Sequence, residues 1–259
     1  GLIRAAAAAN AVHGSKVGVF GGGFQGMGDF AVTANELQKN FGATLLSADP
    51  KEMKEISASV SQAEIQAEQQ ADKEIFAFPE ELNQENYDAN TRACLTIRKW
   101  IEKHSLSAFS VNFLQVTAEN GLDSMPFTEA CKAMTRGIGY AGEGDALNAM
   151  LSGALLQAFP ETSFVEIFCP DWKNDTLFLS HMGEMNYDLA AEKPQMRNVS
   201  FNYTDAKPPV VGYSKFKKGA AVYANIYRDE TGYCLLATPV EMLEVKEDAF
   251  PCSMRGWMK

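Results

Sequence analysis

KVGVFGGGFQG, residues 16–26, is the stretch of sequence that decides the fold. Lys16–Phe20 is a short apolar strand, and the glycines that follow turn the chain sharply. The next segment, 29–41, has apolar residues at helical spacing and ends at Gly42, a residue suited to a helix C-terminal cap. Preceded by a helix at 2–13, this order of helix, strand, glycine turn and helix is typical of an α/β domain.

The same alternation continues to about residue 160. We expect further strands at 43–47 and 108–114, and helices at 50–72, 85–103, 127–136 and 145–159. The strand 108–114, AFSVNFL, is of the buried kind found in parallel sheets. The pattern predicts a three-layer, Rossmann-like α/β domain in residues 1–160, with ligands near the carboxyl ends of its strands. The loops after Phe20 and Leu114 should face that site.

After Pro160 the pattern changes to short strands separated by Pro, Gly, Asn and Asp. The expected strands are 162–169, 176–182, 198–204, 220–228 and 232–237. We therefore predict a β-rich, barrel-like or sandwich-like domain in residues 161–259, which we expect to be incomplete. A site at the boundary of the two domains would be in a common place for an active site.

Charge and cysteine content narrow the function. With 33 acidic and 23 basic residues the net charge is −10, which disfavours nucleic acid and anionic lipid as partners. No apolar run approaches the ~20 residues of a membrane helix. Five cysteines without a C-x-x-C pair argue against a disulfide framework and a structural zinc site. We expect a cytoplasmic protein with a small-molecule substrate.

The glycines at 21–26 also satisfy the dinucleotide fingerprint G-x-G-x-x-G after a strand. Asp49 lies slightly beyond the usual distance of ~20 residues from it. A nucleotide-dependent oxidoreductase is therefore one hypothesis, and a plain tight turn is the alternative.

A second group of residues indicates metal chemistry. Glu143 lies in GYAGEGD (residues 139–145), Glu166 in a strand that appears apolar on both faces, and His181 in a similar strand. Two carboxylates and an imidazole suit a divalent cation that polarises sugar oxygens. Alternatives stay open: Glu143 could only complement a helix dipole, Glu166 could pair with an arginine, and His181 could be a hydrogen-bonded core residue.

Together the motifs GYAGEGD, TSFVE (162–166) and LSHMGE (179–184) resemble the catalytic core of the L-arabinose isomerase and L-fucose isomerase family, with the arabinose isomerase pattern the more similar. The resemblance runs from about Lys16 to about Asn186. It implies an aldose–ketose isomerase that works through a cis-enediol.

By this resemblance Glu143, Glu166 and His181 would bind manganese, or another divalent cation such as magnesium or cobalt. Glu143 and Glu166 would also be the acid and base, and Gln115 and Phe127 would contact the sugar. Phe127 could equally be a core residue. The full-length protein would be a homo-oligomer acting on an aldose or ketose.

The family has a further ligand histidine nearer its C-terminus and an additional N-terminal α/β domain, and neither has a counterpart in this sequence. We therefore expect a fragment with weak metal binding and little activity of its own. The alternative is a non-catalytic sugar-binding or assembly module on the same fold.

Overall fold

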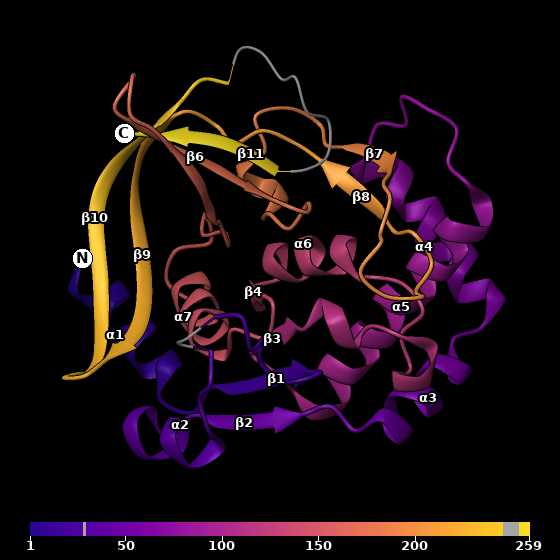
Figure 1. Cartoon of the computed structure of the whole chain (residues 1–259), viewed down its shortest axis with the longest axis horizontal. Helices are drawn as coiled ribbons and strands as arrows, with labels where there is room; N and C mark the ends of the chain where they lie inside the picture. The colour runs from indigo at the N-terminus through magenta and orange to yellow at the C-terminus, as the bar shows by residue number, and fades with distance from the viewer. Residues whose placement is uncertain (28–29, 246–253) are drawn as a thin grey trace.

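The computed structural model describes residues 1–27, 30–245 and 254–259. A four-stranded parallel sheet forms the centre of the first part (Figure 1). Its order is β2-β1-β3-β4, with bounds β1 Lys16–Phe20, β2 Thr44–Ser47, β3 Ala108–Val111 and β4 Gly139–Gly142. The predicted α/β class is confirmed.

Helices lie on both faces of this sheet. Their bounds are α1 Leu2–Val12, α2 Ala34–Phe41, α3 Pro50–Ser59, α4 Gln62–Ile75, α5 Gln84–His104, α6 Phe127–Thr135 and α7 Ala146–Leu156. Most have side-chain caps. Thr33 and Ser61, for example, each form a capping box that begins a helix.

Glycines allow the helices to approach the sheet closely. A Cβ on Gly139 of β4 would lie 2.2 Å from the backbone nitrogen of Gly153 in α7. On the opposite face, a Cβ on Gly18 of β1 would lie 2.4 Å from the buried ring of Trp100 in α5. The sheet is therefore held between α7 and α5 by contacts that larger residues would prevent.

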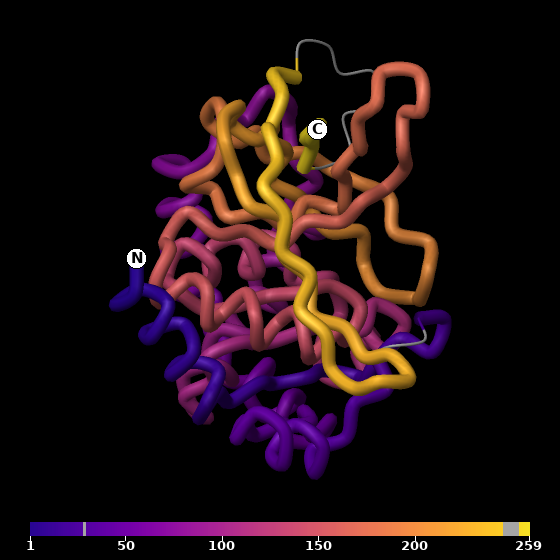
Figure 2. Tube along the Cα trace, turned by 90° about the vertical axis from the view of Figure 1, so that its left-hand side faces the viewer, coloured from indigo at the N-terminus to yellow at the C-terminus, as the bar shows by residue number. Residues whose placement is uncertain are grey.

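The second part is antiparallel. One sheet has the order β5-β6-β11-β10-β9, and β7 and β8 form a separate pair. The bounds are β5 Ile167–Asp171, β6 Thr176–His181, β7 Gln195–Asn198, β8 Val210–Tyr213, β9 Gly219–Asp229, β10 Gly232–Leu243 and β11 Met254–Met258. Figure 2 shows the β9–β10 hairpin running down past the α/β part, where β9 packs against α7.

Several predicted elements differ from the structure. The strand predicted at 162–169 begins only at Ile167, and Ile167 and Phe168 are 42% and 71% exposed. The prediction of a buried strand there was therefore wrong. The strand predicted at 198–204 is absent, since β7 ends at Asn198.

The helix predicted at 50–72 is two helices, because Ser61 caps a new one. The helix predicted to start at Asp29 begins at Ala34, and Asp29 itself lies outside the described residues. The strands β4, β7, β8 and β11 were not predicted.

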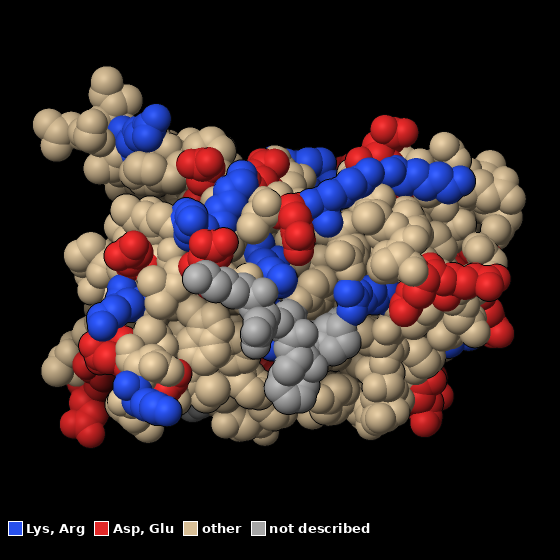
Figure 3. All heavy atoms as spheres, turned by 90° about the horizontal axis from the view of Figure 1, so that it is seen from above, with Lys and Arg blue, Asp and Glu red and all other residues tan. Residues whose placement is uncertain are grey.

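The main hydrophobic core contains residues from both parts of the chain, for example Trp100 of α5 and Ile226 of β9. The predicted boundary at residue 160 stays a prediction. The face seen in Figure 3 carries lysine and arginine beside aspartate and glutamate, not gathered by sign. Across the described residues, none of the helices is long and apolar enough to cross a membrane.

Candidate active site

Glu143 lies at the carboxyl end of β4, in the turn that leads to α7. Asp145 caps that helix by accepting a hydrogen bond from the backbone of Asn148. The backbone of Glu143 is left-handed, with φ of 61°, a conformation that costs a non-glycine residue roughly 1–2 kcal/mol. Strain of this kind is often found at functional sites.

The glycine-rich loop after β1 packs against this turn. The backbone N–H of Phe24 donates to the carbonyl oxygen of Glu143 at 2.8 Å. Gly144 has φ of 88°, and a Cβ there would lie 2.2 Å from the carbonyl oxygen of Gly22. From the neighbouring strand β3, the hydroxyl of buried Ser110 accepts a hydrogen bond from the N–H of Gly144 at 2.8 Å. Contacts from the loop after β1 and from β3 therefore hold the backbone of the turn that carries Glu143.

Glu166 and His181 come from the antiparallel part and meet at this edge. Oε2 of Glu166 lies 3.5 Å from Nε2 of His181. The ring of His181 packs edge-on against Phe164, with centroids 5.4 Å apart. A Cβ on Gly142 would lie 3.1 Å from its Cε1 atom. Gly142, the residue before Glu143, therefore leaves room for the imidazole of His181.

Glu184 is a fourth member of the group that the sequence reasoning missed. It is 1% exposed, its Oε2 is hydrogen-bonded to Nδ1 of His181, and its Oε1 accepts from the hydroxyl of Tyr140 at 2.7 Å. The only signal in the sequence was a glutamate three residues after the histidine. It showed neither the burial of the carboxylate nor which ring nitrogen it contacts.

The acidic groups dominate the electrostatics of this cluster. Burial raises the pKa of Glu143 and of Glu166, and neighbouring carboxylates raise both further, while His181 acts in the opposite direction. Burial by itself would lower the pKa of His181, but Glu184, Glu166 and Glu143 raise it to about 9. Burial and Glu184 also raise the pKa of Tyr140 well above its usual value.

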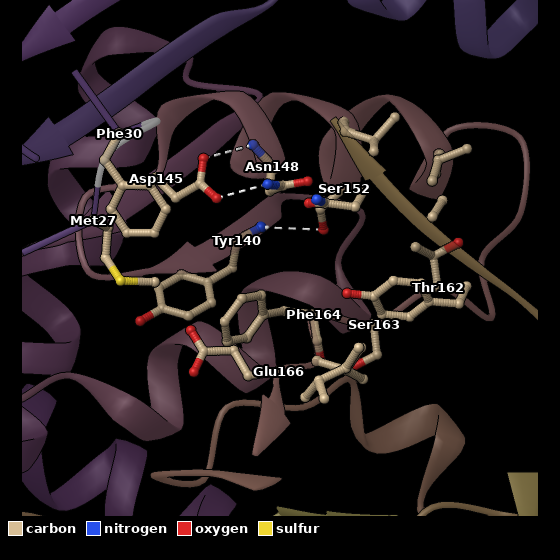
Figure 4. A pocket seen from close by; sticks show the side chains of 17 residues that line it. Met27, Phe30, Tyr140, Asp145, Asn148, Ser152, Thr162, Ser163, Phe164 and Glu166 are labelled. Carbon is tan, nitrogen blue, oxygen red and sulfur yellow. Dashed lines mark hydrogen bonds between the residues drawn. The ribbon is translucent and has the colours of Figure 1, made fainter. Parts of the chain in front are cut away.

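Two cavities border the cluster. A small one of about 80 Å³ is lined by Glu143, His181 and Phe127, among others. A larger one of about 320 Å³ lies between α7, β9 and the segment 162–167, with Glu166 in its wall. Figure 4 shows the Glu166 carboxylate and the Tyr140 hydroxyl close to each other, with Asn148 and Ser152 further along the cavity.

The two predicted sugar contacts lie in different places. Phe127, at the start of α6, is 3% exposed and part of the core, yet it also lines the small cavity with Glu143 and His181. Gln115 is exposed at the end of a 3-10 turn, Phe113–Gln115, and packs beside Gly21 and Asn120. It lines neither cavity. Both substrate roles stay predictions.

The donor set fits a divalent cation in its chemistry. Within 1–27, 30–245 and 254–259, no lysine or arginine forms an ion pair with Glu143, Glu166 or Glu184, so these three carboxylates, of which Glu184 is buried, outnumber the nearby positive charges. Oxygen and imidazole ligands suit such ions. As they stand, however, no three His, Cys, Asp or Glu side chains in these ranges converge closely enough to enclose a metal.

Comparison with known proteins gives a consistent result. A family model described as the L-arabinose isomerase central domain matches residues 19–158. The L-arabinose isomerase of Shouchella clausii is 25% identical over 240 residues, covering 90% of this chain and 48% of that protein. That of Pediococcus pentosaceus is 29% identical over 203 residues, covering 74% and 42%. That of Halalkalibacterium halodurans is 24% identical over 258 residues, covering 95% and 51%. The chain spans about half the length of these relatives.

Proposed function

The chain belongs to the L-arabinose isomerase family, since the central-domain model matches residues 19–158 of its 259, and we propose that it carries the catalytic core of an aldose–ketose isomerase. The observation that supports this most is that Glu166 lies 3.5 Å from Nε2 of His181, while Glu143 and His181 line the same small cavity where the parallel and antiparallel parts join. Sugar isomerisation needs two proton-transfer groups beside one substrate, and this edge of the sheet offers them.

The two carboxyl groups are suited to acid–base catalysis. Moving a carbonyl group between C1 and C2 removes a proton from one carbon and returns a proton to the other, through a cis-enediol. A general acid or base works best when its pKa is near the working pH, and burial shifts the pKa of Glu143 and Glu166 upward in that direction. We assign the proton transfers to these two residues.

Glu143, Glu166 and Nε2 of His181 would hold the divalent cation, manganese in the first instance. When bound, such an ion would supply positive charge beside the two substrate oxygens as they become negative. The residues around the candidate ligands would hold them in position for such an ion. Gly142 and Phe164 confine the His181 ring, and Glu143 lines the same small cavity as His181.

Because the chain covers only about half of its relatives, we propose full turnover for a protein that includes this chain and little turnover for the chain alone. The whole protein would be a cytoplasmic homo-oligomer, and its substrate a small aldose or ketose.

Two measurements test the proposal. Addition of Mn²⁺ should raise the melting temperature of the chain, and Glu143→Gln should abolish that increase while Glu102→Gln, a change at an exposed helix position, retains it. A panel of aldoses, including L-arabinose, should then give ketose with the protein that includes this chain. Absence of any Mn²⁺ effect on the unchanged chain would contradict the metal site, and a sugar-binding module without isomerase activity would be the remaining function.

A further inference from the structure

The burial of Glu184 calls for an explanation. Its carboxylate is 1% exposed, and its hydrogen-bonding partners are one phenol, Tyr140, and one imidazole, His181. In the described parts of the chain it forms no ion pair with lysine or arginine. Burying a carboxylate with so few partners is costly, and an apolar residue would fill the space at less cost. Stability alone is therefore a poor reason for a glutamate here.

The geometry shows what the carboxylate does to its neighbour. An ionised carboxylate can only accept, so Glu184 pairs with a protonated Nδ1 of His181, and the geometry leaves Nε2 as the nitrogen that points to Glu166 at 3.5 Å. A histidine binds a metal through an unprotonated nitrogen, and the hydrogen bond made by the other nitrogen decides which one that is.

Tyr140 completes the arrangement. Its hydroxyl donates to Oε1 of Glu184 at 2.7 Å and so leaves Oε2 for the imidazole. Tyr140 belongs to β4, whereas Glu184 and His181 belong to the end of β6 and the loop after it. The hydrogen bonds therefore connect the strand that precedes Glu143 to the strand that supplies the histidine.

We propose that Glu184 is a positioning residue, which, held by Tyr140, orients the His181 ring so that Nε2 faces Glu166, where a divalent cation would take the place of the Nε2 proton. The proposal rests on the proposed function, because it gives Glu184 a role at that same metal site. It assigns Glu184 no contact with the substrate.

The test uses the full chain and Mn²⁺ alone as the probe. Isothermal titration calorimetry should show that Glu184→Gln weakens Mn²⁺ binding by about 10- to 100-fold, the usual effect of removing such a partner. The amide of glutamine can donate to Nδ1, which would leave the proton on Nε2. Tyr140→Phe should weaken binding less, in the same direction. Tyr187→Phe is the matched control, because its buried hydroxyl forms no hydrogen bond with Glu184.

A second readout separates positioning from a loss of stability. With diamagnetic Mg²⁺ added, long-range ¹H–¹⁵N NMR should place the ring proton of His181 on Nδ1 in the unchanged chain, and not uniquely there in Glu184→Gln. If Glu184→Gln folds, binds Mn²⁺ with the affinity of the unchanged chain and still carries the ring proton on Nδ1, the positioning role of Glu184 is wrong, while the proposed metal site stands. If Glu184→Gln does not fold, unchanged affinity in Tyr140→Phe would overturn it. Failure of the unchanged chain to bind Mn²⁺ would overturn the proposed metal site as well.

Discussion

Replacement of Gly144 by alanine should destabilise the chain through one contact that can be isolated. The new Cβ would lie 2.2 Å from the carbonyl oxygen of Gly22 and 2.6 Å from Cα of Gly23. Both are backbone atoms, so no side-chain rotation can relieve the clash. Alanine at φ of 88° costs roughly 1–2 kcal/mol by itself, and overpacking adds roughly 1–3 kcal/mol.

Gly14→Ala is the matched control for this change. Gly14 has nearly the same backbone angle, φ of 95°, but a Cβ there would meet nothing within 4 Å. The control therefore contains the backbone strain without the clash. In a chain of this size each kcal/mol lowers the melting temperature by roughly 2–4 °C. Gly144→Ala should melt roughly 2–12 °C below Gly14→Ala.

Urea denaturation followed by circular dichroism would give the free energies of unfolding for both variants. Because the clash moves the turn that carries Glu143, Gly144→Ala should also reduce the Mn²⁺ response, and Gly14→Ala should not. If the two variants have the same free energy of unfolding, the loop after β1 does not support the Glu143 turn in the way the structure indicates, and the reasoning is refuted.

Three further predictions concern other parts of the molecule. Glu143→Gly should stabilise the chain by roughly 1 kcal/mol in urea denaturation, because it relieves the left-handed strain, while it removes the Mn²⁺ response; a loss of stability would contradict the strain. Ser61→Ala should cost about 1 kcal/mol in the same assay, since Ser61 caps α4; no loss would mean that the cap is dispensable. Burial alone would raise the pKa of Glu68, but Arg98 and Lys132 lower it from 4.5 to about 2, so its contribution is present above pH 4.5 and is lost as the pH falls toward 2. The difference in stability between the wild type and Glu68→Gln should therefore shrink by about 3 kcal/mol over that range, and a difference independent of pH would contradict this assignment.

The sequence was most informative where local chemistry alone determines the structure. The strand Lys16–Phe20 was predicted with its observed bounds, because a short apolar run is followed directly by glycines, and four of its residues are indeed buried. The long helix α5 was predicted to within a residue at each end. In such segments the periodicity of apolar residues and the flanking residues agree, and tertiary contacts only reinforce them.

The failures have a different cause. β4, with the sequence GYAG, has little intrinsic strand preference and is a strand because β3 pairs with it and α7 packs closely on Gly139. The apolar residues Ile167 and Phe168 suggested a buried strand, but apolarity does not reveal which face is exposed. The role of Glu184 depends on its hydrogen bonds with His181, three residues earlier, and with Tyr140, 44 residues earlier. The spacing of these residues in the sequence does not reveal that they meet.

The glycine-rich stretch at 21–26 shows how one pattern can serve two structural purposes. In the dinucleotide fold the helix begins at the glycines, so that its N-terminus faces the pyrophosphate. Here the capping residue of the next helix is Thr33, ten positions after Gly23. The helix N-terminus is therefore not formed by the glycine loop. The loop instead packs with its backbone against the turn that carries Glu143: a Cβ on Gly144 would lie 2.2 Å from the carbonyl oxygen of Gly22, and the N–H of Phe24 donates to the carbonyl oxygen of Glu143. The same stretch that determines the α/β fold thus also supports the candidate catalytic glutamate.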